Sequence, residues 1–324
     1  MKKILSLLLA LGLVLGLCAC GAPATQTEPT ETAVDAAKEA LDGKKIIFIG
    51  NSYTYVGKVV YQVYNSHPEL EKRQNDRGFF WQLCQMNGID VDVTNWTFSS
   101  HRLHNTFREP CAIEGDCFGL NHEDYLTDRV YDYVVIQPHA NDLSQEHIKE
   151  DIDYIMNLFR EANPDVKFVI FGCAALYGHN TTGKSYPEIT GYFKELAEQD
   201  HIIADWGNIV TDVVNGKTAV PGSQLPYDNA SFVISDGHHP SLLGGYLATM
   251  TVFCAITGKS ALELPADFFI SDTERAAMVE KQLKGSYERG ELDTNFHTAL
   301  SMESEVKGFQ QLVDQYLSEK PYMQ

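Results

Sequence analysis

The sequence predicts an α/β domain of three layers, with a mainly parallel central sheet covered by helices on both faces. Short apolar runs rich in β-branched residues, typical of buried strands, alternate along the chain with segments of helical spacing. Parallel strands need long crossover connections, which are usually helical, so this alternation indicates a parallel sheet. One long segment, residues 240–256, is apolar on nearly all sides and predicts a buried helix.

The expected strands share a short length and a high content of Val, Ile and Phe. They cover residues 45–49, 89–93, 133–136, 166–171 and 201–204. The expected helices follow apolar spacings of three and four, and two of them end at glycine stop signals, Gly88 and Gly258. They cover residues 56–66, 78–86, 144–162, 186–199 and 240–256, followed by a polar, helical tail at 272–324. Residues 94–128 are polar and carry no predicted element.

The N-terminus carries an export signal, which must be separated from the fold. Lys2 and Lys3 precede an apolar run, residues 5–17, that is too short to span a bilayer comfortably. The sequence Leu17-Cys18-Ala19-Cys20-Gly21 resembles the lipobox of bacterial lipoproteins. This resemblance implies that residues 1–19 are a signal peptide and that Cys20 carries lipid, which anchors an extracytoplasmic protein to the cell membrane. The alternative is an ordinary secretory signal with incidental cysteines.

The mature chain is expected to begin with a flexible segment. Residues 20–42 are rich in Thr, Glu, Ala and Pro and contain no aromatic residue, so they predict a disordered tether. Residues 43–324 then form the folded domain, because neither an internal repeat nor a second-domain boundary is evident.

The strongly acidic composition limits the kinds of partner that the protein is expected to bind. The net charge is −19, and removal of Lys2 and Lys3 brings the mature chain to −21, with 23 basic against 44 acidic residues. This charge argues against nucleic acid and against electrostatic attachment to anionic lipid. We therefore expect contact with the membrane only through the lipid on Cys20.

Five cysteines lie beyond the signal region. Cys111 and Cys117 bracket a loop-like segment, and in an oxidising compartment they are candidates for a local disulfide. Cys84, Cys173 and Cys254 lie in apolar surroundings and are expected to pack as small hydrophobic residues. No CxxC pair is present, so a structural zinc site has no support, and we expect neither a metal nor an organic cofactor.

Two distant segments carry the chemistry. Ser52 follows the first strand through Gly50-Asn51, and ligands bind at the carboxyl ends of strands in open parallel sheets. Asp236-Gly237-His238-His239 precedes Pro240 near the expected buried helix. A serine needs an adjacent base to act as a nucleophile, His239 can supply that base, and Asp236 can orient the imidazole. The competing interpretation of Ser52 is a turn or helix-capping residue.

With these segments in this order, the chain resembles the SGNH (GDSL-like) hydrolases, a flavodoxin-like family of esterases and lipases. The family's first block, Gly-Asp-Ser, corresponds to Gly50-Asn51-Ser52, and its fifth block, Asp-x-x-His, corresponds to Asp236-Gly237-His238-His239. The third block, Gly-x-Asn-Asp, corresponds to His139-Ala140-Asn141-Asp142, with histidine in place of glycine. The second block, which supplies a glycine, corresponds to residues 99–103, with Ser100 in its place.

The resemblance implies an oxyanion hole made by the backbone N–H groups of Ser52 and Ser100 and the side-chain amide of Asn141. Serine serves as a backbone donor at ordinary φ and ψ, but it is costly if the position requires a positive φ. Gln137 is an alternative amide donor. Asn141 also competes as a helix cap for the segment that follows it.

The resulting expectation is a serine esterase that hydrolyses acyl esters outside the cytoplasm. Exported members of this family often deacetylate polysaccharides, so the resemblance favours an acetylated glycan over other small ester substrates. A lipase or thioesterase using the same triad is one alternative. A lipoprotein that binds a ligand without catalysis, on a degenerate hydrolase fold or as a two-lobed solute-binding protein, is the other.

Overall fold

Five parallel strands form the central sheet in the order β2-β1-β3-β4-β5. They are β1 (Lys44–Gly50), β2 (Val91–Thr97), β3 (Tyr133–Ile136), β4 (Lys167–Gly172) and β5 (Ile202–Asp205). The computed structural model describes residues 35–60, 76–105, 122–126, 128–139, 147–172, 188, 190–234, 238–265 and 303–323. This strand order is that of flavodoxin-like folds, in which ligands bind at the carboxyl ends of β1 and β3.

Helices surround this sheet in the compact unit formed by residues Ala36 to Gln324. The α-helices are α2 (Ala36–Leu41), α3 (Ser52–Tyr55), α4 (Phe79–Met86), α5 (His122–Tyr125), α6 (Ile148–Ala162), α8 (Phe193–Glu198), α9 (Trp206–Val214), α10 (Asn229–Phe232), α11 (Leu242–Thr257) and α14 (Glu303–Glu319). The short 3-10 helices of the described residues are η2 (Leu103–Asn105), η3 (Ala261–Glu263) and η4 (Pro321–Met323).

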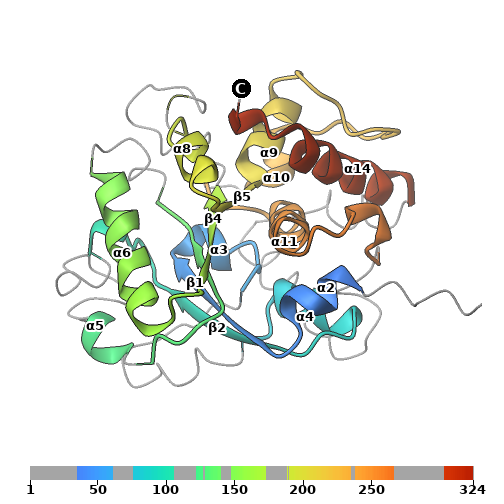
Figure 1. The fold of residues 1–324 in the computed structure, drawn as a ribbon. Helices are drawn as coiled ribbons and strands as arrows, with labels where there is room; N and C mark the ends of the chain where they lie inside the picture. Colours follow the sequence, from blue (N-terminus) through green and yellow to red (C-terminus); the bar gives the residue numbers. More distant parts are fainter. Residues whose placement is uncertain are drawn as a thin grey trace, which may run out of the picture. The chain divides into compact units, whose positions relative to one another are not determined.

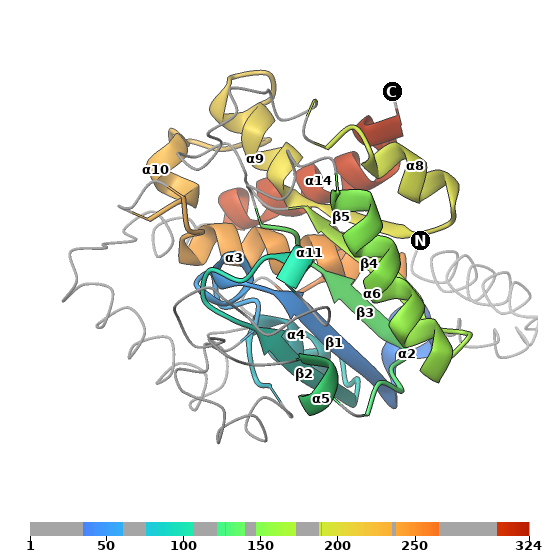
Figure 2. The same ribbon diagram turned by 90° about the vertical axis from the view of Figure 1, so that its left-hand side faces the viewer.

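The sheet separates two apolar cores, because successive side chains of a strand point to opposite faces. Ile46 and Phe48 of β1 pack into a core with α4, α11 and α14. Ile47 and Ile49 pack into the other core with α6 and α8. Figures 1 and 2 show these two sets of helices on opposite sides of the sheet. The predicted three-layer α/β fold with a parallel sheet is therefore confirmed.

Helix α11 has the all-round burial that its sequence predicts. Of its sixteen residues, all but Ala255 are buried. The Ser241 hydroxyl caps its first turn by accepting from the Gly244 N–H, and Gly258 ends it with φ 69°. Among the described residues, no helix has both the length and the apolar character needed to cross a bilayer.

Several boundaries differ from the sequence-based expectation. Strand β2 was expected at 89–93 but extends to Thr97, because the polar residues Thr94, Asn95 and Thr97 are buried within the sheet. Residues 56–60 form a turn rather than the expected helix, with Lys58 at φ 66°. Within the helix expected at 186–199, residues 190–192 form a bend and turn before α8 begins at Phe193, and α9 was not predicted.

The prediction of a disordered tether at residues 20–42 is wrong for the C-terminal part of that range. Ala36–Leu41 forms α2, and Ala37 and Leu41 are fully buried in the core beside α4 and α11. The small apolar residues of this segment therefore pack, even though its composition resembles a linker.

The described cysteines agree with their predicted packing role. Cys84 and Cys254 are free and buried, and burial raises the pKa of both thiols, which keeps them protonated. Cys20, Cys111, Cys117 and Cys173 lie outside the described residues, so the lipidation and the disulfide stay predictions.

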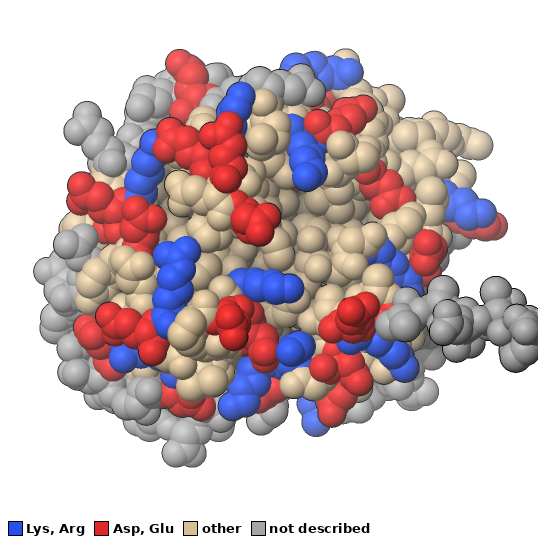
Figure 3. All heavy atoms as spheres, viewed as in Figure 1, with Lys and Arg blue, Asp and Glu red and all other residues tan. Residues whose placement is uncertain are grey.

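Charged side chains of both signs are interspersed over the face shown in Figure 3. Several form surface ion pairs, including Lys149 with Glu195 at 2.5 Å and Lys217 with Asp212 at 3.0 Å. Such exposed pairs contribute little to stability, because water and salt screen them.

One buried carboxylate holds helix α14 against the rest of the unit. Glu305 is fully buried and accepts hydrogen bonds from the Gln224 N–H at 2.8 Å and the Tyr227 hydroxyl at 2.7 Å. Burial raises the pKa of Glu305, but hydrogen bonds from Ser223, Gln224, Tyr227 and Leu225 outweigh it, so the pKa lies below its ordinary value. Glu305 is therefore the charged anchor between α14 and residues 223–227.

Glu305→Gln should lower the free energy of unfolding at pH 7 by about 1.5–3 kcal/mol, because it removes the charged acceptor of the Gln224 N–H and the Tyr227 hydroxyl. The difference from wild type should disappear as the pH falls below about 4 and Glu305 becomes protonated in the folded state, since a lowered pKa stabilises only the ionised form. Urea unfolding at several pH values measures both effects. Glu303→Gln, on the exposed start of α14, is the control and should leave the free energy of unfolding close to that of wild type. An equal effect of the two substitutions would refute the anchoring role.

Candidate active site

Ser52 lies at the carboxyl end of β1, as the sequence predicts. Strand β1 ends at Gly50, Asn51 caps the next helix, and Ser52 is the first residue of α3. The neighbouring strand β3 ends at Ile136, directly before Gln137. Ser52 therefore lies where the strand order reverses between β1 and β3, the ligand-binding position of this fold.

His239 reaches Ser52 from the far end of the chain. Its Nε2 atom lies 2.7 Å from the Ser52 Oγ, a hydrogen-bond distance between residues 187 positions apart. The Ser52 side chain is largely buried, and His239 is partly exposed. An imidazole in this position can accept the serine proton, which is the first requirement of an activated serine nucleophile.

The backbone around His239 is held by an antiparallel bridge. Val233 pairs with Pro240, and the Ile234 N–H donates to the His239 carbonyl at 2.9 Å. Ser241, two residues after His239, donates its hydroxyl to the Ser231 carbonyl and caps α11. The position of His239 is therefore fixed by the start of the buried helix.

Two glycines allow α11 to approach the segment that carries Ser52. A Cβ atom on Gly245 would lie 1.6 Å from the Gly57 carbonyl oxygen, and a Cβ on Gly57 would lie 2.9 Å from the Gly245 Cα. Gly57 follows α3 directly through the turn at residues 56–58. Close backbone packing thus links the helix after His239 to the helix that begins at Ser52.

Gln137 organises the turn that presents Ser52. Its buried Oε1 accepts from the Asn51 N–H at 3.1 Å and from the Thr54 hydroxyl at 3.0 Å. A Cβ on Gly50 would lie 2.8 Å from the same oxygen, so glycine is needed for this contact. The side-chain oxygen of Gln137, a residue named above as an alternative amide donor, thus serves as an acceptor for the nucleophile turn.

Asn51 joins this turn to the loop after β2. Its side-chain oxygen accepts from the Tyr53 N–H at 3.1 Å, and its Nδ2 donates to the His101 carbonyl at 3.0 Å. Asparagine can do both because its amide carries an acceptor and two donors. An ionised aspartate, the residue of the resembled family's first block, has no donor for that carbonyl.

Ser100 has a left-handed backbone, with φ 58°. The sequence predicts this residue to correspond to the glycine of the second block. A serine at this positive φ costs about 1–2 kcal/mol. Ser100 therefore has the positive φ at which a serine is costly.

Buried histidines support the same loop. His101 and His122 stack with ring centroids 4.5 Å apart, and the Trp96 Nε1–H donates to the His122 Nδ1 at 2.8 Å. Because the indole N–H can only donate, His122 Nδ1 is unprotonated. This packing role was not predictable from local pattern, since His122 lies 26 positions after Trp96.

Aromatic rings surround the Ser52–His239 pair. Tyr53 lies with its ring centroid 5.6 Å from those of His139 and His239, and the His238 ring is 4.1 Å from His239. His238 is thus a packing neighbour of His239. Asp236 and Asn141, the predicted orienting carboxylate and oxyanion amide, lie outside the described residues.

A cavity of about 580 Å³ lies elsewhere, and neither Ser52 nor His239 lines it. Its walls come from the ends of α8, α11 and α14 and include Asp314, Lys259 and Tyr322. A cluster able to hold a metal ion among the described residues, His104, His147 and Asp151, is also separate from the Ser52–His239 hydrogen bond.

The chain resembles solved structures but matches no protein-family model and no curated protein. A DUF4886 family protein from Bacteroides uniformis is similar over 86% of this chain and 95% of its own, with 15% identity and a TM-score of 0.51. At this identity, the likeness bears on the fold alone.

Two other similar structures cover about two thirds of this chain. A catalytic mutant of an acetylxylan esterase from Geobacillus stearothermophilus covers 66% of this chain and 94% of its own, with 17% identity and a TM-score of 0.43. A proposed GDSL-like lipase from Parabacteroides merdae covers 67% of this chain and 97% of its own, with 18% identity and a TM-score of 0.44.

Gly245→Ala should lower the free energy of unfolding by about 1–3 kcal/mol, because the added methyl group overlaps the Gly57 carbonyl. The direction of the change in the free energy of unfolding is the test. In an ordinary helix interior, the same substitution raises stability by about 1 kcal/mol. Chemical unfolding of the variant measures the change, and an increase in stability would contradict the close approach of α11 to the turn after α3.

Proposed function

We propose that this protein is a serine esterase in which Ser52 is the nucleophile and His239 is the general base. The observation that carries the proposal is the 2.7 Å contact between the Ser52 Oγ and the His239 Nε2 at the switch point of the sheet. A purely structural serine does not need an imidazole at this distance. The motif Asp-x-x-His assigns Asp236 to orient His239 and stabilise its charged form.

The reaction follows from this arrangement. His239 takes the proton of Ser52 as the Oγ attacks the ester carbonyl, and it returns the proton to the leaving alcohol. Water then attacks the acyl-serine as His239 takes its proton, the bond between the acyl carbon and the Ser52 Oγ breaks, and His239 returns the proton to the Oγ as the acid is released. The resembled family assigns the oxyanion donors to the N–H groups of Ser52 and Ser100 and to the Asn141 amide.

The backbone of Ser100 supports a role in the oxyanion hole. Non-glycine residues with positive φ are costly and cluster at functional sites, where the surrounding structure maintains them. A backbone N–H keeps its donor whatever side chain the residue carries. The change from glycine to serine is therefore compatible with oxyanion binding.

The described structure gives less support to a two-lobed solute-binding protein. Such a protein has two comparable α/β lobes joined by a hinge, whereas the described residues of the unit Ala36 to Gln324 form a single five-stranded sheet. An acetyl ester on a glycan is the proposed substrate. The proposal rests on the family resemblance and on residues 1–20, whose sequence predicts a lipoprotein at the cell surface.

Ser52→Ala and His239→Ala should each reduce kcat for hydrolysis of p-nitrophenyl acetate by about 10⁴-fold or more, because the nucleophile and its base act as one unit. His238→Ala, the neighbouring imidazole, and Ser318→Ala, on the exposed face of α14, are the matched controls. We expect the two controls to retain activity within about tenfold.

The substrate is tested with the same protein. Acetate release from acetylated xylan oligosaccharides, and p-nitrophenyl esters that turn over more slowly as the acyl chain lengthens, would support the acetylesterase. A preference for long acyl chains would favour the lipase alternative. A folded protein that hydrolyses none of these esters would favour ligand binding without catalysis.

Ser100→Ala and Ser100→Gly should both keep kcat within about threefold, because the proposed donor is the backbone N–H. Ser100→Gly should also raise the free energy of unfolding by up to about 1 kcal/mol, since glycine relieves the left-handed strain. Steady-state kinetics and urea unfolding provide the two measurements. A large loss of kcat in Ser100→Ala alone would assign the catalytic contribution to the hydroxyl instead.

A further inference from the structure

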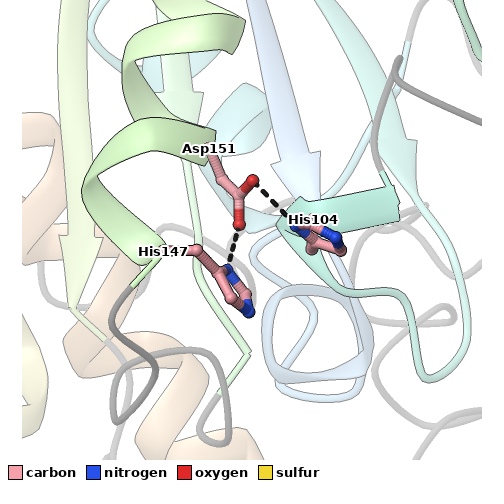
Figure 4. A group of neighbouring side chains, drawn as sticks. All are labelled: His104, His147 and Asp151. Carbon is pink, nitrogen blue, oxygen red and sulfur yellow. Dashed lines mark hydrogen bonds and ion pairs between the residues drawn. The ribbon is translucent and has the colours of Figure 1, made fainter.

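Two histidines from separate elements converge on one buried aspartate (Figure 4). His104 lies in η2, which follows the loop after β2, and His147 and Asp151 lie at the start of α6. The Asp151 Oδ1 is 3.0 Å from the His104 Nδ1, and its Oδ2 is 2.6 Å from the His147 Nδ1. The three side chains form a cluster apart from the Ser52–His239 pair.

The burial of the cluster is uneven. The Asp151 side chain is 0% exposed, whereas the side chains of His104 and His147 are 44% and 36% exposed. A buried carboxylate is costly unless it is paired or coordinates a metal ion. The two imidazoles lie between this carboxylate and solvent, so an ion has a route to all three groups.

The donor set and its spacing fit a small transition-metal ion. One ligand atom from each of the three residues lies within 4.8 Å of the other two. With metal–nitrogen and metal–oxygen distances of about 2.0–2.2 Å, tetrahedral ligand atoms lie about 3.3–3.6 Å apart, so adjustments of around an ångström suffice. Two imidazoles and a carboxylate suit Zn²⁺ and its neighbours, whereas Mg²⁺ and Ca²⁺ prefer oxygen ligands alone.

We propose that His104, His147 and Asp151 bind a divalent first-row transition-metal ion, for which Zn²⁺ is the probe. The ion would take the place of the two Nδ1 protons that now face the carboxylate, with solvent in the remaining position. This site has a structural role in connecting the loop after β2 to the start of α6. It does not depend on hydrolytic activity at Ser52.

The proposed metal site lies close in sequence to the residues that hold the nucleophile turn. His104 lies three residues after His101, whose carbonyl accepts from Asn51, and four residues after Ser100. A metal ion at this cluster would restrain the same loop that holds the nucleophile turn. The proposed metal site would therefore order this loop. It is tested by measuring Zn²⁺ binding and protein stability rather than enzyme turnover.

The test uses an untagged protein beginning at Ala22, which retains every described residue, after treatment with a chelator and desalting. Calorimetric titration with ZnCl₂ should give one saturable site, and titration with MgCl₂ should give none. Zn²⁺ at 100-fold excess over its Kd should also raise the Tm by several degrees.

Matched variants locate the site. His104→Gln and His147→Gln should each weaken Zn²⁺ binding by about 100-fold or more, because loss of even an outer-shell partner weakens metal sites by 10–100-fold. His201→Gln, a histidine before β5, should bind Zn²⁺ as wild type does. His239→Ala should also bind normally, which separates this result from the fate of the proposed esterase.

Three outcomes would overturn the proposal. They are the absence of a saturable Zn²⁺ site in the wild type, equal binding by wild type and both glutamine variants, and equal loss of binding in His201→Gln. In any of these cases, the cluster is a hydrogen-bonded clamp between η2 and α6 without a metal function.

Discussion

The close approach of α11 to the turn after α3 is the constraint on which the site depends. Backbone atoms at Gly245 and Gly57 pack so tightly that a methyl group at either position would collide with the partner. Ser52 begins the helix before Gly57, and His239 lies just before the helix that contains Gly245. This packing joins the first and last thirds of the chain, and it brings the His239 Nε2 to 2.7 Å from the Ser52 Oγ. Because α11 is almost wholly buried, close packing in the core fixes its position. The fixed helix in turn holds His239 in place.

Buried amides extend this rigidity across the carboxyl edge of the sheet. Gln137 after β3 accepts from the turn after β1, and Asn51 in that turn donates to the carbonyl of His101 after β2. Three neighbouring loops are thereby joined by side chains whose hydrogen bonds are strengthened by the low dielectric around them. Catalytic groups need such support, because small displacements of a nucleophile or its base carry large penalties in rate.

The sequence was sufficient for the parts of the fold that local pattern determines. Apolar runs identified β1 and β3, and all-round hydrophobicity with a terminal glycine identified α11. It missed the second half of β2, which is polar yet buried, because the hydrogen-bond partners of Thr94 and Asn95 cannot be inferred from periodicity. It failed also for α2, whose burial is decided by distant residues of the core.

The same division applies to the site. Ser52 and His239 were predictable because their motif spacings are local, and the structure brings them together. The acceptor role of Gln137 was not predictable, since its partners Asn51 and Thr54 lie more than eighty residues earlier in the chain. The convergence of His104 on Asp151 was not predictable for the same reason, although the i, i+4 spacing of His147 and Asp151 is a local signal for part of it.

The central claim is that His239 activates Ser52, and reaction with a fluorophosphonate probe tests it without a choice of substrate. The adduct is mapped by mass spectrometry in wild type and in His239→Ala, after circular dichroism has shown both to be folded. The account predicts a single adduct on Ser52 in the wild type, which forms at least about a thousand times more slowly in the variant. The absence of an adduct on Ser52 in folded wild-type protein, or equal labelling in the variant, would contradict it.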